Sequence, residues 1–251
     1  MSTPEVVIVV GLGEVGRPLL NILSESFDCL AVDISPVDTD RPCSVLHVCY
    51  PFQIRDFVAT TARYIAKYNP RLTFIHSTVA PGTTRSTQAA AATDRVVYSP
   101  VRGKHARMES DMLRYKKFVA ASSSHIAREA EAHLSAAGFQ TAQFRTLEIA
   151  ELSKLLETTY LGVLIGWAQE VERLAEHLGG TSDDVNAFIQ EIDFLPSHIF
   201  PGHIGGHCVM PNIKILQTQF SSAFLDAVVE SNELKQQQLL AATPAAAAAV
   251  R

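Results

Sequence analysis

The sequence is poor in the features that mark secreted, membrane-spanning and metal-binding proteins. Its 251 residues include four cysteines, which form no CxxC pair and no zinc-ligand spacing, so neither a disulfide framework nor a metal site is expected. No stretch reaches the roughly 18 apolar residues that a membrane helix needs. The start, MSTPEVVIVV, lacks the basic segment of a signal peptide. We therefore expect a cytoplasmic protein with reduced thiols and no membrane partner.

Positive charge is also scarce. Lys and Arg number 21 against 26 Asp and Glu, which gives a formal net charge of -5. Such a chain has no electrostatic reason to coat nucleic acid or an anionic surface. The hydrophobic fraction of 47% and the charged fraction of 19% are those of a globular protein with a buried core.

The first part of the chain alternates short apolar runs with segments of helical period. Apolar runs without polar alternation indicate strands that are covered on both faces, and their alternation with helices predicts a parallel sheet. We therefore expect an α/β fold of the Rossmann type. The strand candidates are Val6–Val10, Cys29–Val32, Val45–Cys49, Leu72–Ile75, Val96–Tyr98 and Phe118–Ala121, and the clearest helices between them are Phe52–Tyr68 and His125–Ala137.

The pattern changes near Leu147, where apolar residues begin to recur every three or four positions as far as Leu178. This predicts one long central helix that ends at Gly179-Gly180. A short helix over Thr181–Gln190, capped by Thr181 or Ser182, and a last one from about Asn212 to Leu240 should follow. The predicted domains are 1-146 for a Rossmann domain, 147-240 for a helical dimerisation and substrate region, and 241-251 for a disordered tail.

A glycine-rich turn directly follows the first strand candidate. Gly11-Leu12-Gly13-Glu14-Val15-Gly16 has the pattern G-x-G-x-x-G between a strand and a helix, the context in which it binds a dinucleotide pyrophosphate. Asp33 closes the second strand about 20 residues later, where an acid accepts hydrogen bonds from a ribose and repels a 2′-phosphate. The cofactor is therefore predicted to be NAD. The alternative is a helix-capping glycine turn without a ligand.

Further motifs resemble those of the UDP-glucose/GDP-mannose dehydrogenase family, which oxidises nucleotide sugars to acids with NAD. The segment His76-Ser77-Thr78-Val79-Ala80-Pro81-Gly82-Thr83-Thr84 is similar to the family's S-T-V-x-P-G-T-T. The other matching blocks, in the family's order, are the glycine turn, Val45–Pro51, Ala150-Glu151-Leu152-Ser153-Lys154 with Gln169-Glu170, and Pro201-Gly202-His203-Ile204-Gly205-Gly206-His207-Cys208. The resemblance adds Tyr50, Pro51, Ser77 and Thr78 to the cofactor-binding residues Gly11, Leu12, Gly13, Glu14, Val15, Gly16 and Asp33.

The resemblance also implies a catalytic set. In the family a cysteine thiolate attacks an aldehyde, and the resulting thioester is hydrolysed. Cys208 takes that position, Lys154 is placed to stabilise an oxyanion, and Thr78 to orient a water or hydroxyl. Thr158 and Asn212 stand where the family has asparagine and aspartate. The alternatives are a buried, inert Cys208 and a Lys154 that only faces solvent.

The segment after the fifth strand departs from the family. Where the family has S-P-E-F-x-x-E, this chain has Ser99-Pro100-Val101-Arg102-Gly103-Lys104-His105, so both acids are missing. Arg102, Lys104, His105 and His207 are the candidate substrate residues, and cations in such a loop suit a carboxylate or phosphate. The alternative is a solvated basic loop.

Two functions from different classes remain. The first is an NAD-dependent oxidoreductase that acts on a small polar alcohol or aldehyde, such as a sugar or hydroxy acid, by a two- or four-electron route. The chain is expected to be a short family member without the C-terminal nucleotide-sugar domain. The second is a catalytically silent NAD-binding module. A homodimer would cover the apolar stripe of the long helix, on which Trp167 falls as a core or dimer-seam residue.

Overall fold

The computed structural model describes residues 4–33, 35–193, 200–206 and 208–242. The chain forms two compact units, Met1–Lys154 and Leu155–Arg251. The division falls within the long helix α6 (Leu147–His177), which begins where the sequence pattern changes. The predicted domain limits, 1-146, 147-240 and 241-251, stay a prediction.

The first unit is built on a five-stranded parallel sheet in the order β2-β1-β3-β4-β5. Every strand predicted for this sheet is present, and the expected α/β class is confirmed. Val10 at the end of β1 pairs with Val32 on one side and Val48 on the other, so the carboxyl ends of the central strands are level. The strands are β1 (Val6–Val10), β2 (Cys29–Val32), β3 (Cys43–Val48), β4 (Leu72–Ile75) and β5 (Val96–Tyr98).

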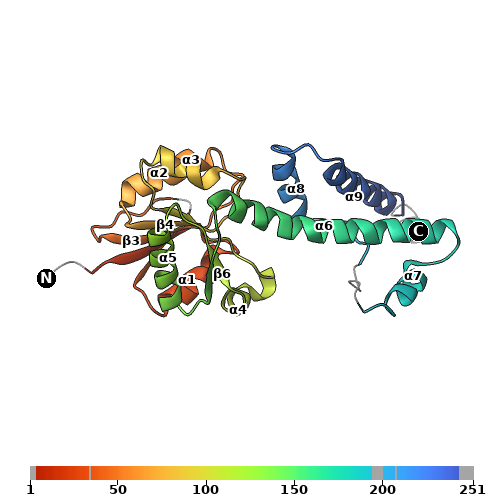
Figure 1. Cartoon of the computed structure of the whole chain (residues 1–251), viewed down its shortest axis with the longest axis horizontal. Coiled ribbons are helices and arrows are strands. Elements are labelled where there is room, and N and C mark those ends of the chain that lie inside the picture. Colours follow the sequence, from red (N-terminus) through yellow and green to blue (C-terminus); the bar gives the residue numbers. More distant parts are fainter. Residues whose placement is uncertain (1–3, 34, 194–199, 207, 243–251) are drawn as a thin grey trace, which may run out of the picture. The chain divides into compact units, whose positions relative to one another are not determined.

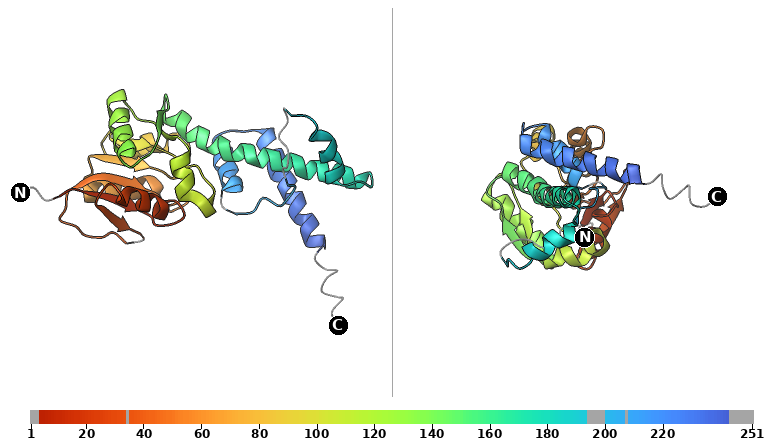
Figure 2. Two further views of the ribbon diagram at one scale, coloured as in Figure 1. Left: turned by 90° about the horizontal axis from the view of Figure 1, so that it is seen from below. Right: turned by 90° about the vertical axis from the view of Figure 1, so that its right-hand side faces the viewer.

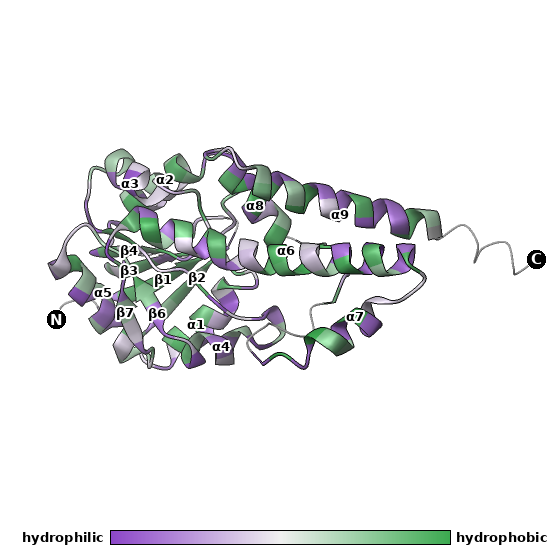
Figure 3. Cartoon of the chain, turned by 45° about the vertical axis from the view of Figure 1, so that its right-hand side comes forward, coloured by the Kyte–Doolittle hydropathy of each residue, from purple (hydrophilic) through white to green (hydrophobic). Residues whose placement is uncertain are grey.

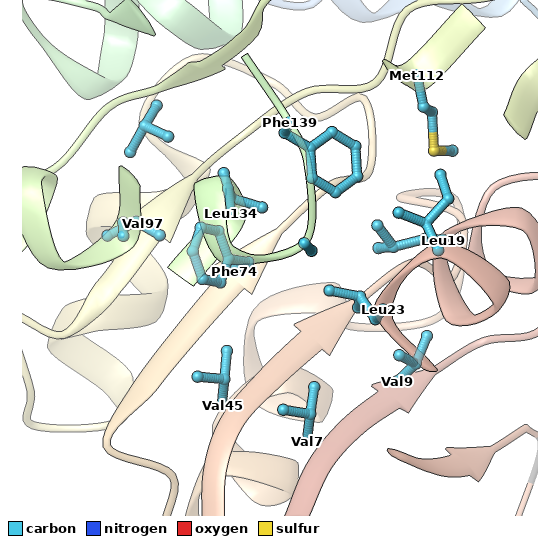
Figure 4. Close-up of a cluster of buried hydrophobic side chains, with 14 of the residues drawn as sticks. Val7, Val9, Leu19, Leu23, Val45, Phe74, Val97, Met112, Leu134 and Phe139 are labelled. Carbon is cyan, nitrogen blue, oxygen red and sulfur yellow. The ribbon is translucent and has the colours of Figure 1, made fainter. Parts of the chain in front are cut away.

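Helices cover both faces of this sheet, as Figure 1 shows. Alternate strand residues point to opposite faces, so each face has its own apolar core. Val7, Val9 and Phe74 pack under one set of helices (Figure 4), and Ile8, Val10 and further residues under the other. The helices are α1 (Gly16–Ser24), α4 (Met108–Arg114) and α5 (Ser124–Ala136) on the first face, and α2 (Phe57–Tyr68) and α3 (Thr83–Ala90) on the second.

A second, two-stranded parallel sheet was only half predicted. It joins β6 (Lys117–Val119) to β7 (Thr141–Gln143), and an antiparallel bridge between Tyr98 and Ala120 links β6 to β5. The sequence indicated β6 but not β7. The latter is three residues long and part-exposed, with one apolar residue between two polar ones, so no hydrophobic pattern marks it.

The second unit is helical. It contains the rest of α6 and α7 (Ser182–Ile189). Figure 2 (left) shows α6 from the side as one continuous helix. Of the two predicted caps, Thr181 caps α7, in a reciprocal capping box with Asp184.

The last predicted helix, 212–240, is wrong as a single element. The structure has two helices there, α8 (Val209–Gln217) and α9 (Ala223–Ala242). The reason is local, because the Ser222 hydroxyl accepts a hydrogen bond from the Leu225 N–H and starts a new helix. Apolar and polar residues alternate along α6 and α9 in Figure 3. Of the helices in the described ranges, none has both the length and the apolarity to span a bilayer.

Candidate functional site

The order of the strands places a topological switch point at the carboxyl edge of the sheet. After β1 the chain enters α1 on one face, and after β3 it enters α2 on the other. In open sheets with this topology, ligands bind at the point between two such strands. Gly11 and Tyr50 leave β1 and β3 at this point. Their backbones are in such close contact that a Cβ on Gly11 would lie 2.6 Å from the Tyr50 nitrogen.

The three glycines of the turn have different structural roles. Gly11 has φ +88°, in the region that favours glycine, whereas a Cβ on Gly16 would lie 1.7 Å from the Gly11 carbonyl oxygen. Around Gly13 no atom would come within 4 Å of an added Cβ. Helix α1 starts without a side-chain cap and without an acid in its first turn. Gly11 and Gly16 thus pack against protein backbone and leave no room for a side chain. Gly13 and the positive end of α1 suit an anionic ligand.

Asp33 lies beside this turn. Its Oδ1 accepts a hydrogen bond from the Leu12 N–H at 3.2 Å, and the side chain is exposed. The interaction joins two residues that the sequence assigned to the same cofactor. It holds the carboxylate at the end of β2 on the side where a ribose would lie in a Rossmann-type site.

The exits of β3 and β4 meet at the same edge. The Ser77 hydroxyl donates to the Tyr50 carbonyl oxygen at 2.6 Å, and the Tyr50 hydroxyl shares a 2.6 Å hydrogen bond with Thr61. Pro51 is exposed and Thr78 is half-buried. These contacts fix the two loops relative to each other, which gives the candidate cofactor residues of this edge a rigid frame.

The basic segment reaches the glycine turn at one residue. His105 Nδ1 lies 3.2 Å from Glu14 Oε2, which pairs two residues predicted to contact substrate and cofactor. Arg102 has other partners, because its guanidinium donates to the Lys116 carbonyl oxygen at 2.6 Å and lies over the ring of Phe118. Lys104 is exposed.

The predicted catalytic residues of the second unit include one bonded pair. The Asn212 amide donates to the Thr158 hydroxyl at 2.8 Å, and Asn212 is buried. Cys208 precedes the first residue of α8 and lies one helical turn before Asn212, where the helix dipole favours an anionic sulfur. Gly162 allows α8 to approach α6, because a Cβ there would lie 2.7 Å from a Val209 methyl. The predicted substrate residue His207 lies outside the described residues.

Two of the family-like motifs touch each other through a residue that the sequence analysis gave no role. Glu151 on α6 is fully buried, and its carboxylate accepts from the Gly82 N–H at 2.6 Å and from the Thr84 N–H and hydroxyl at 2.7 and 2.6 Å. It therefore caps α3, whose own N-cap residue is a glycine. Its position three residues before Lys154, in an otherwise apolar helix face, was the available signal.

Lys154 itself lies half-buried on α6 at the end of the first unit. In the described part of the chain, no group of three or more histidine, cysteine or acidic side chains is arranged to hold a metal ion.

Comparison with known proteins agrees with the motifs. Residues 148–234 match the sequence model described as the UDP-glucose/GDP-mannose dehydrogenase family, central domain. The predicted resemblance is confirmed. None of the curated proteins compared with the chain matches it in sequence.

Solved dehydrogenases share the fold at low identity. A UDP-D-ManNAc dehydrogenase from Pyrococcus horikoshii is 20% identical with a TM-score of 0.79, over 91% of this chain and 68% of that one. The UDP-N-acetyl-mannosamine dehydrogenase of Staphylococcus aureus is 19% identical with a TM-score of 0.78, over 98% and 72%. The 3-hydroxyisobutyrate dehydrogenase of Mycobacterium tuberculosis is 15% identical with a TM-score of 0.68, over 94% of each chain.

Proposed function

We propose that the chain is an NAD-dependent dehydrogenase that interconverts a small polar alcohol and its aldehyde or acid, such as a sugar or hydroxy acid. The observation that carries this proposal is the glycine turn, closed at Gly11 and Gly16 and open at Gly13, with Asp33 bonded to it. The family match and the dehydrogenases that share the fold support the same chemistry. Bound NAD would supply the hydride acceptor or donor.

The residues of the first unit suit this cofactor chemically. The pyrophosphate would lie at the start of α1 against Gly13, and Asp33 would accept hydrogen bonds from the adenosine ribose. An acid at this place disfavours the 2′-phosphate of NADP. The predicted contacts of NAD with Tyr50, Pro51, Ser77 and Thr78 are part of the proposal.

Cys208 is the proposed nucleophile of a four-electron route. Its sulfur would attack the aldehyde carbon, while the proton of the thiol passes to a base and the carbonyl electrons move onto oxygen. Lys154 is the proposed group for the oxyanion or for proton transfer, and Thr78, Thr158 and Asn212 are proposed to position water or substrate. Arg102, Lys104, His105 and His207 are the proposed contacts to a polar or anionic substrate.

A binding and turnover experiment tests the proposal. We expect NAD to bind the full chain in calorimetry, and NADH formation or consumption with at least one sugar, hydroxy acid or aldehyde of a broad panel. Cys208→Ala should abolish acid formation, and a covalent substrate adduct on Cys208 should be visible by mass spectrometry. Cys29→Ala, which removes a half-buried thiol on β2, is the matched control.

The second candidate function is a catalytically silent NAD-binding module. The absence of glutamates from the segment Ser99–His105 favours it, since hydrolysis of the thioester in the four-electron route needs a group that activates water. Tight NAD binding without turnover on the whole panel would decide for this module. Absence of affinity for NAD and NADP would overturn both functions.

We also propose that the chain forms a homodimer through α6. Trp167 is not a core residue, because it is 61% exposed, and with Phe224 and Val163 it lines an apolar groove of about 270 Å³ between α6 and α9. Exposed apolar surface of this kind marks an interface. Light scattering should give twice the monomer mass for the wild type and a monomer for Trp167→Glu. The cytoplasmic location stays a prediction.

A further inference from the structure

Four buried or half-buried basic side chains form a continuous hydrogen-bonded row along one face of the sheet in the first unit. Lys117 Nζ lies 3.1 Å from His76 Nδ1, His76 Nε2 lies 2.8 Å from His47 Nδ1, and His47 Nε2 lies 3.0 Å from His133 Nε2. Each histidine in the middle uses both ring nitrogens. We propose that Lys117, His76, His47 and His133 form a proton relay that runs between the carboxyl and amino edges of the sheet.

The row begins at the carboxyl edge. Lys117 Nζ donates to the carbonyl oxygens of Ser99 and Pro100 at 2.6 and 2.9 Å, immediately after β5 ends. His76 follows the last residue of β4, and its Nδ1 lies 2.7 Å from the Ser99 carbonyl oxygen. This is the edge at which ligands bind in such sheets.

The row ends near the amino edge of the same sheet. His133 lies on α5 and lines a cavity of about 220 Å³ together with Glu5, Asp28, Ser44 and Arg71, which stand at the starts of strands. Val7, Phe27 and Val45 complete the lining, and the cavity is large enough for water, so a proton on His133 Nδ1 can exchange with solvent. The middle of the row is dry, since His47 and His76 are 0% and 2% exposed.

Aromatic packing fixes the orientation of the two buried rings. His47 and His76 lie within 7° of parallel with centroids 5.1 Å apart, and Phe74 stacks on both. Neither ring can reach water, so any proton that it exchanges passes to or from a neighbour in the row. Two arrangements of hydrogens connect the row, one the reverse of the other. Only the second also places a proton on His76 Nδ1 for donation to the Ser99 carbonyl oxygen at 2.7 Å.

In the first arrangement Lys117 is an ammonium group that donates to His76 Nδ1. His76 then carries its proton on Nε2 and donates to His47, and His47 carries its proton on Nε2 and donates to His133. In the second arrangement Lys117 is a neutral amine, and the imidazoles carry their protons on His76 Nδ1, His47 Nδ1 and His133 Nε2. Passing from the first to the second moves one proton out of Lys117 and releases one from His133 Nδ1. Each imidazole gains and loses one proton and is neutral before and after.

The electrostatic surroundings keep the histidines neutral and Lys117 able to switch. Burial lowers the pKa values of His47 and His76 well below their usual range, and that of His133 to about 4. Burial also lowers the pKa of Lys117 to about 7. Around Lys117 the thiol of Cys49 acts in the opposite direction, whereas the charges of Lys154 and Arg102 lower this pKa further.

The acidic groups near His133, at the amino edge of the sheet, form ion pairs with arginines. Asp28 pairs with Arg41 at 2.7 Å, and Glu5 with Arg71 at 2.7 Å. The neighbouring acids therefore have cationic partners, and His133 can exchange its proton with solvent without becoming a fixed cation.

The purpose of the relay rests on the proposed function. Oxidation of an alcohol by hydride transfer releases one proton at the carboxyl edge, where bound cofactor and substrate would exclude water. A relay that starts at Lys117 would carry this proton to the opposite edge. The relay itself is testable without any turnover.

Nitrogen-15 NMR of the histidine rings in the full chain is the first test. Between about pH 5.5 and about pH 8.5, which brackets the Lys117 pKa of about 7, the three rings should exchange tautomers together with a single midpoint. In Lys117→Met the three tautomers should stay the same at every pH. Lys116→Met, on an exposed neighbouring side chain, should behave as the wild type. Fixed tautomers in the wild type, or three independent midpoints, would overturn the relay.

A variant in the middle of the row supplies the second test. In His47→Phe, His76 should still follow Lys117 while His133 no longer does. If turnover is found, this variant should lower kcat on the order of 10²-fold with little change in KM, the loss typical of a removed proton-transfer group. Coupled tautomers without turnover would support the relay and contradict the proposed dehydrogenase activity. Turnover with fixed tautomers would support the dehydrogenase activity and contradict the relay.

Discussion

Single residues at the glycine turn show how one motif combines two constraints. At Gly16 the constraint is internal, because a Cβ would overlap the Gly11 carbonyl oxygen at 1.7 Å. At Gly13 the protein imposes no steric limit within 4 Å. A glycine that the fold does not require at this place fits the proposed approach of a pyrophosphate.

This difference predicts opposite effects of the same substitution. Gly13→Ala should leave the thermal unfolding midpoint unchanged and weaken NAD binding at least tenfold, on the order of 1.4 kcal/mol. Gly16→Ala should destabilise the fold by about 1–3 kcal/mol, since backbone must move. Calorimetric titration and thermal unfolding of both variants provide the measurements. Equal NAD affinity of Gly13→Ala and wild type would argue against a pyrophosphate at the turn.

Asp33 carries the second prediction at this scale. Removal of its carboxylate in Asp33→Ala should weaken NAD binding by roughly 1.5–3 kcal/mol, the range for a hydrogen bond to a charged group. NADP should lose less, because the repulsion of its 2′-phosphate disappears as well. The ratio of the two dissociation constants, measured for wild type and variant, is the decisive quantity. An unchanged ratio would remove Asp33 from the cofactor site.

At the scale of elements, the contact of α6 with α3 explains why two distant motifs occur together. The buried carboxylate of Glu151 accepts three hydrogen bonds from Gly82 and Thr84. Glu148, one turn earlier on the same helix, forms an exposed ion pair with Arg85 at 2.6 Å. The two acids offer a matched comparison of buried and exposed carboxylates.

Glu151→Ala should therefore lower the free energy of unfolding by about 3 kcal/mol, because it leaves buried N–H groups without partners. Glu148→Ala should cost about 0–1 kcal/mol, as exposed ion pairs do. Urea unfolding of the two variants measures both effects. Similar small losses in both would mean that water replaces the missing carboxylate at α3.

At the scale of the whole molecule, the buried row of basic groups makes stability depend on pH. The folded-state pKa of His133 is about 4, below that of an exposed histidine, so the unfolded chain binds the proton more readily. Stability should fall as the pH drops from about 6.5 to about 4. The folded-state pKa of Lys117 is lowered to about 7, so this group changes stability in the same direction as His133. Its contribution to stability falls as the pH drops from about 10.5 to about 7.

The corresponding prediction concerns Lys117→Met. Between about pH 7 and about pH 9 the free energy of unfolding should rise for the wild type by a few kcal/mol and stay nearly level for the variant. Urea unfolding at several pH values gives both curves, with Lys116→Met as the control. Parallel curves for wild type and Lys117→Met would mean that Lys117 keeps its ordinary pKa in the fold.

The sequence by itself determined the parallel sheet, the glycine turn with its acid, the long helix α6 and the cap of α7. These features depend on local patterns: apolar runs, the period of 3.6 residues, and residues that fix a turn or a helix end. The blocks that resemble a dehydrogenase family could also be recognised from the sequence, because each is a short stretch of chain. The break between α8 and α9 was missed since one serine hydroxyl decided it.

Only the tertiary structure decided which distant side chains meet. His47 lies in the apolar strand β3, while His76 follows β4, His133 lies on α5 and Lys117 on β6. Nothing in their sequence spacing brings them together, since strand order and register set those distances. The same holds for Glu151 against Gly82 and Thr84 and for Asn212 against Thr158. Local patterns fix the elements, whereas contacts between residues far apart in the chain arise only when the elements pack.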